Sequence, residues 1–74
     1  MNHLLEMEHE AENNSWTMDA MEMHGGSFVK CLGALARRAD PINLKLIKET
    51  WSEYWRQYEQ IGQDMRREHD SGAS

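Results

Sequence analysis

A chain of 74 residues, 39% of them apolar, has room for one small domain that buries only a modest share of its surface. The formal net charge of −5 argues against general nucleic-acid binding, which depends on a clustered basic face, and the single cysteine excludes an intramolecular disulfide. No apolar stretch approaches the roughly 20 residues of a membrane-spanning helix, and a lone thiol indicates a reducing compartment, so we expect a cytoplasmic protein.

The negative charge is concentrated at the start of the chain. Residues 1–26 carry six acidic and no basic side chains, whereas the remainder carries eight basic and seven acidic ones. Residues 1–14 have a helix-forming composition but only a weak apolar stripe, so we expect them to form an acidic, flexible N-terminal segment. Two interpretations stay open for this segment: a solvated tail, or an acidic arm that docks on a basic partner.

The stretch MEMHGGSFVK at residues 21–30 predicts a corner between two helices. Ser15 or Thr17 can cap a short first helix, and Gly25 can end it by adopting the left-handed conformation at little cost. The alternative for HGGS is an anion or metal site. It is disfavoured because the stretch lacks both the preceding strand and the lysine of a phosphate-binding loop.

A second helix of medium length is expected to begin after this corner. Ser27 is a suitable N-cap, and the apolar residues expected on the buried side then recur at spacings of four, three and four: Phe28, Leu32, Leu35 and Ala39. Gly33 within this helix indicates either the close approach of another backbone or simple tolerance. Asp40 and Pro41 supply the cap and the first residue of a third helix.

The third helix has the strongest pattern, an unbroken apolar series at spacings of three and four: Leu44, Ile47, Trp51, Tyr54, Tyr58, Ile61 and Met65. It predicts one long helix over residues 42–67, about 39 Å in length. The second helix would cover only half of its stripe. We therefore expect an all-α fold, a small three-helix domain (short, medium and long) over residues 15–67, with a frayed, disordered tail at 68–74.

No motif predicts catalysis, a cofactor or a metal. HEAEN at residues 9–13 begins like the zinc-protease motif H-E-x-x-H, but Asn13 stands where the second histidine is required. Cys31 has only Lys30 as a nearby activator and belongs to no recognisable catalytic arrangement. We therefore expect no enzyme, no cofactor and no metal site.

A protein-interaction surface is the remaining candidate, because aromatic and arginine side chains often anchor such surfaces. Packing predicts Trp51 and Tyr54 inside, whereas Trp55, one position off the stripe, is expected to reach a partner. The partner would be another protein or a second copy, in a homodimer through the helix at 42–67. Alternatively, the Trp16 helix and the Leu4–Leu5 segment fold back over the stripe and the protein is a monomer. The candidate residues are Trp51, Trp55, Tyr58, Ile61 and Met65, with Arg37 and Arg38 near the second corner.

Two other functions stay open, a helix-turn-helix-like DNA-binding regulator and a purely structural helical oligomer. A resemblance bears on the choice. Residues 16–58 carry a Trp, the box DAMEMHGGSFV, an AD…N corner and a closing W-EYW--Y. In these features the chain resembles a family of short uncharacterised accessory proteins of tailed bacteriophages and prophages. The resemblance implies an accessory protein acting in the cytoplasm of a bacterial host, and it assigns no functional residues. Two features depart from the family's pattern: the acidic extension that precedes Ser15, and the presence of Cys31.

Overall fold

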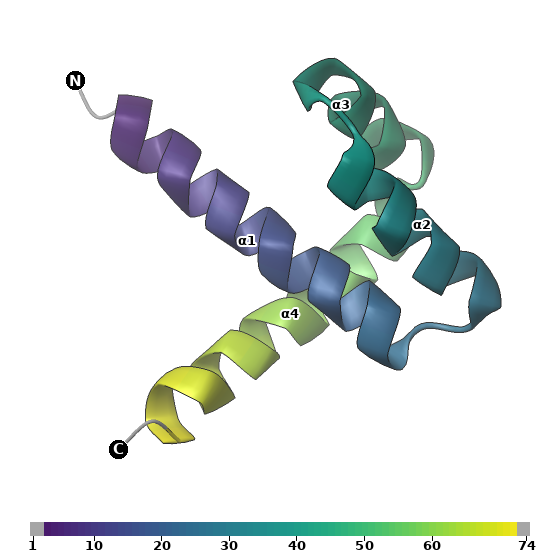
Figure 1. Cartoon of the computed structure of the whole chain (residues 1–74). Coiled ribbons are helices and arrows are strands. Elements are labelled where there is room, and N and C mark those ends of the chain that lie inside the picture. Colours follow the sequence, from purple (N-terminus) through teal and green to yellow (C-terminus); the bar gives the residue numbers. More distant parts are fainter. Residues whose placement is uncertain (1–2, 73–74) are drawn as a thin grey trace.

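The computed structural model describes residues 3–72, and these residues form four helices joined by one or two residues. Figure 1 shows the two long helices crossing near their middles, with the two short helices together on one side of the crossing. The all-α prediction is confirmed, but the prediction of three helices is wrong. The four helices are α1 (His3–His24), α2 (Ser27–Arg38), α3 (Pro41–Thr50) and α4 (Ser52–Gly72).

The long helix predicted over residues 42–67 is broken at Trp51, whose φ of −116° and ψ of 49° lie outside helical geometry. The break leaves the apolar spacing intact, so the sequence pattern does not reveal it. It changes the direction of the chain, and α3 then packs beside α2 while α4 crosses α1. A straight helix would have left half of its apolar stripe uncovered, whereas the two shorter helices each find a neighbour.

The first helix is long rather than short. α1 passes through Asn13, Asn14 and Ser15 without interruption, so the cap expected at Ser15 or Thr17 is not used. The hydroxyl of Thr17 is buried instead and donates to the carbonyl of Asn13 at 2.9 Å. Packing stabilises this helix, because α2 and α4 both contact it extensively. At the other end of the chain, α4 continues to Gly72, beyond the predicted start of a frayed tail.

The two crossings over α1 depend on glycines. A Cβ at Gly62 would lie 2.7 Å from the carbonyl oxygen of Trp16, and a Cβ at Gly33 would lie 2.9 Å from the Cβ of Met21. The absence of side chains therefore lets α4 and α2 lie directly on α1. For Gly33, the interpretation as a close helix approach is the correct one.

The first corner requires glycine for space and not for backbone conformation. No glycine among residues 3–72 has a positive φ, so the left-handed conformation predicted for Gly25 is wrong. A Cβ at Gly25 would lie 2.5 Å from both the carbonyl oxygen of Met21 and Cγ1 of Val29. The N-cap of α2 is Gly26, without a side-chain hydrogen bond, and not Ser27 as predicted.

The core lies where α1, α2 and α4 meet. On α2 the buried side carries Val29, Leu32 and Ala36, so Phe28 and Leu35, which the apolar spacing placed inside, are each 52% exposed. Together the core residues are Met18, Ala20, Met21, Val29, Leu32, Ala36, Ile47, Trp55 and Tyr58. The outward position of these two large apolar residues gives α2 a second apolar surface.

Candidate interaction surface

Four acidic side chains of α1, those of Glu10, Glu12, Asp19 and Glu22, are paired within the chain. Each of the other three helices contributes one basic residue that reaches across to α1. The sequence left open whether the acidic residues form a solvated tail or an arm that docks on a basic partner, and here the basic partner is the rest of the same chain. The ion pairs join Arg37 of α2 to Asp19 and Glu22, Lys48 of α3 to Glu10, and Arg66 of α4 to Glu12.

Arg37 forms the most extensive of these pairs. Its Nε donates to the carboxylate of Glu22 at 3.2 Å, and its Nη2 donates to Asp19. Partial burial alone would lower the pKa of Arg37, but the hydrogen bonds and charges of the two carboxylates outweigh that effect and raise the pKa. Arg37 therefore joins α2 to α1, away from the interaction surface to which the sequence analysis assigned it.

We expect Arg37→Ala to lower the free energy of unfolding by about 1 kcal/mol, the upper range for solvent-screened pairs with good geometry. Arg38→Ala is the matched control. Arg38 has no partner among the described residues, so removal of its side chain should change the free energy of unfolding by less than about 0.5 kcal/mol. Urea unfolding followed by circular dichroism measures both values, and equal losses would contradict the role assigned to Arg37.

The break at Trp51 exchanges the roles expected for two aromatic residues. Trp55, predicted to reach a partner, is 5% exposed and belongs to the core, whereas Tyr54, predicted inside, is 41% exposed. The cause is the rotation of α4 about its own axis, which decides which of its residues face α1. A helix restarted after Trp51 turns a different set of residues toward α1 than a continuous helix would.

The C-terminal part of the predicted apolar stripe is covered by α1 of the same chain. Tyr58 is buried in the core, and Ile61 and Met65 are partly buried and pack against it where α4 meets α1. The sequence left two possibilities for these side chains: pairing with a second copy through residues 42–67, or cover by the N-terminal helix of the same chain. In the structure α1 occupies that position, which removes the physical reason for a dimer at this seam.

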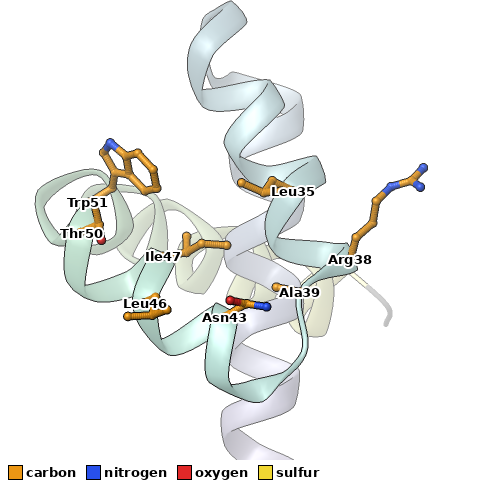
Figure 2. A pocket seen from close by; sticks show the side chains of 8 residues that line it. All are labelled: Leu35, Arg38, Ala39, Asn43, Leu46, Ile47, Thr50 and Trp51. Atoms are coloured by element: carbon orange, nitrogen blue, oxygen red, sulfur yellow. The ribbon is translucent and has the colours of Figure 1, made fainter.

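A different apolar surface is open to solvent, a groove of about 300 Å³ between α2 and α3. Figure 2 shows Leu35 of α2 facing Ile47 of α3, with Arg38 and Trp51 on opposite sides. Leu35 and Leu46 form its walls and are 52% and 54% exposed. The lining residues are Leu35, Arg38, Ala39, Asn43, Leu46, Ile47, Thr50 and Trp51.

Aromatic residues close one end of this groove. The ring of Phe28 lies 6.1 Å from that of Trp51 and 5.6 Å from that of Tyr54, measured between centroids. The other end, at the corner between α2 and α3, carries Arg38 and Asn43. The groove therefore has two chemically distinct ends, one aromatic and one cationic.

The apolar surface extends beyond the groove. Ile42, one turn before Leu46 on α3, is 74% exposed, and Cys31 is exposed on α2 between Phe28 and Leu35. Among residues 10–71, whose side chains the structure describes, six large hydrophobic side chains are exposed; five of them lie here and the sixth is Met23 of α1. We call this surface the groove face and define it as the groove lining together with Phe28, Cys31, Ile42 and Tyr54.

The groove lining is mainly apolar. The polar side chains in the groove lining are Arg38, Asn43 and Thr50, which include no nucleophile paired with a base. The exposed side of α3 beside the groove carries Ile42, Leu46 and Glu49, an apolar and acidic combination that does not suit a DNA-reading helix.

Among the side chains that the structure describes, those of residues 10–71, no three His, Cys, Asp or Glu are grouped so that they could hold a metal ion, and none of the described helices has the length and apolarity to cross a bilayer. Of the predicted interaction residues, Trp51 and Arg38 line the groove and the others lie elsewhere. No protein-family model matches the chain, and no curated protein or solved structure is significantly similar to it.

Proposed function

We propose that the chain is a small helical protein-binding module whose groove between α2 and α3 receives apolar side chains of a protein partner. The observation that supports this most is the groove itself, with Leu35, Leu46 and the adjoining Ile42 all more than half exposed. Apolar surface collected on one face is typical of protein-interaction sites. A groove between two helices suits the apolar side of a helix, which presents side chains at intervals of three and four residues.

The surroundings of the groove support binding rather than catalysis. Its rim is polar at both ends, with Arg38 and Asn43 at the corner and Thr50 near the aromatic end, as expected for a surface that must discriminate among apolar partners. The helices that form it are held to α1 by ion pairs from Arg37 and Lys48. A partner would therefore meet a surface that is largely formed in advance.

We place this module among the accessory proteins of tailed bacteriophages and prophages, acting in the cytoplasm of the bacterial host. The resemblance of residues 16–58 to that family supports the assignment, and the lone, exposed thiol of Cys31 supports a reducing compartment. The partner is then a host factor or another phage component, or a second copy of the chain.

Site-specific photo-crosslinking in bacterial cells tests this function. Benzoylphenylalanine introduced at Leu46, in the groove wall, should give cross-linked protein adducts. The same group at Gln63, which is exposed on α4 outside the groove face, is the control and should give none. Adding Leu35→Asp in the opposite wall should lower the adduct yield at Leu46 severalfold while the helical circular dichroism is retained. Equal adducts at both positions, or none at Leu46, would contradict the proposal.

A further inference from the structure

The groove face is built from two antiparallel helices that pack in one layer. α2 runs from Phe28 at the aromatic end to Arg38 at the corner, and α3 returns from the corner to Trp51. Two such layers can pack face to face as an antiparallel four-helix bundle, in which apolar side chains of both layers fill the space between them. Leu35, Ile42 and Leu46 project from this layer and are 52%, 74% and 54% exposed, so the face has the side chains that such a bundle core needs.

Charges of opposite sign lie at the two ends of the groove face. Arg38 lines the groove at the corner end, and Glu53, which adjoins the groove face, lies beside Tyr54 at the aromatic end. Neither Arg38 nor Glu53 has a partner among the described residues, whereas the basic residues that face α1 are paired with its carboxylates. A twofold axis that runs across the groove reverses the layer in the second copy, so each cationic end meets an aromatic and acidic end.

We infer that the partner in the groove is a second copy of this chain, bound with α2 and α3 antiparallel to those of the first copy. The inference rests on the proposed function of the groove face and identifies its occupant. Arg38 of each copy then lies over the rings of Phe28 and Tyr54 of the other copy and near its Glu53, where both a cation–π contact and an ion pair are available. A partner of different sequence would supply its own complementary charges, so its binding would not require the two ends of this one face to complement each other.

The same geometry brings the two thiols together. Cys31 lies close to the midpoint of α2, which spans Ser27–Arg38, and on the groove face. An axis crossing the middle of the layer places the two Cys31 residues within about one helical turn of each other along the helix direction. Cross-linking of the two native Cys31 thiols therefore tests how the two copies are arranged in the dimer.

Sedimentation equilibrium and thiol cross-linking test the arrangement with the full chain. We expect the wild-type protein to form a dimer of twice 8.7 kDa as its concentration is raised, and a short bismaleimide to join its two Cys31 thiols. The control is a Cys31→Ser, Gln63→Cys protein, which should form the same dimer but cross-link poorly, because position 63 lies on α4 outside the groove face. Cross-linking of both proteins alike would overturn the antiparallel arrangement.

Charge exchange separates a second copy from any other occupant. Arg38→Glu alone and Glu53→Arg alone should each weaken the dimer about tenfold or more, since like charges then meet at both ends. Both residues are at the surface, so the helical circular dichroism should be unchanged. A mixture of the two variants should dimerise again, because each contact then joins opposite charges. Failure of the mixture to recover would overturn the inference.

Different experimental results would contradict the proposed function and the inference of a second copy. A protein that stays monomeric at every concentration, while the photo-crosslinker at Leu46 captures a different protein, overturns the second copy and leaves the groove function standing. A monomer with no adduct at Leu46 contradicts both. An adduct at Leu46 with the mass of two chains, lost in the Arg38→Glu protein, supports both.

Discussion

Replacing Gly62 by valine is expected to lower the free energy of unfolding by about 3 kcal/mol or more, a large part of the stability of a domain this small. A Cβ at this position would lie 2.7 Å from the carbonyl oxygen of Trp16 and 3.0 Å from the backbone nitrogen of Thr17. These are backbone atoms of α1, which cannot rotate away as the end of a side chain can. The two long helices must therefore separate, and the contacts around the crossing are lost. Urea unfolding followed by circular dichroism measures the change.

The control for Gly62→Val is Gln63→Val. Gln63 is the next residue of α4 and is exposed, so valine there costs only the few tenths of a kcal/mol that separate the helix propensities of the two residues. The pair differs in the position of the new side chain and hardly in its chemistry. Similar stability of the two variants would mean that α1 and α4 do not cross as closely as the structure has them.

The features that the sequence predicts well are those that depend on neighbouring residues. The second corner is an example: Asp40 caps α3 by accepting a hydrogen bond from the backbone of Asn43 at 2.8 Å, and Pro41 is the first helical residue, as predicted. The all-α fold is also predictable, because apolar residues at spacings of three and four recur along the chain. Both the capping pattern and the apolar spacing can be recognised from a few neighbouring residues.

The features that the sequence predicts poorly depend on contacts between distant residues. Gly62 interrupts no pattern and carries no motif, yet it decides where α4 crosses α1, because its neighbour there is Trp16, 46 positions earlier in the chain. The acidic residues of α1 similarly left two interpretations open. Only the packing shows that Arg37, Lys48 and Arg66 each reach one part of that helix.

The candidate site was difficult to predict for the same reason. Phe28 and Leu35 fit the apolar stripe of a buried helix side, and the sequence therefore placed them inside. In the structure α1 covers the side of α2 that carries Val29, Leu32 and Ala36, and the other apolar side is left open as the groove. A helix that is apolar over so wide an arc has two sides to cover, and this breadth was the signal in the sequence.

The phase of α4 after the break at Trp51 gives the last prediction. We expect Trp55→Ala to lower the free energy of unfolding by about 4 kcal/mol, because it removes a large core side chain and leaves a cavity. Trp55 is 5% exposed, and the Nζ of Lys48 lies 5.3 Å from the centroid of its ring, a cation–π contact that the substitution also removes. Its indole Nε1 is buried without a hydrogen-bond partner. Trp55→Phe, which keeps most of the volume and removes this unpaired donor, should therefore be much less damaging than alanine.

Tyr54→Ala is the matched control, because Tyr54 precedes Trp55 directly and is 41% exposed. Its loss should cost about 1 kcal/mol, chiefly through the contact with the ring of Phe28. An unbroken helix over residues 42–67 predicts the reverse order, since Tyr54 would then lie on the apolar stripe and Trp55 outside it. Thermal unfolding of the two alanine variants thus distinguishes two helices from one. A larger loss for Tyr54→Ala would restore the continuous helix, whereas a larger loss for Trp55→Ala supports the break that turns α3 toward α2 and opens the groove.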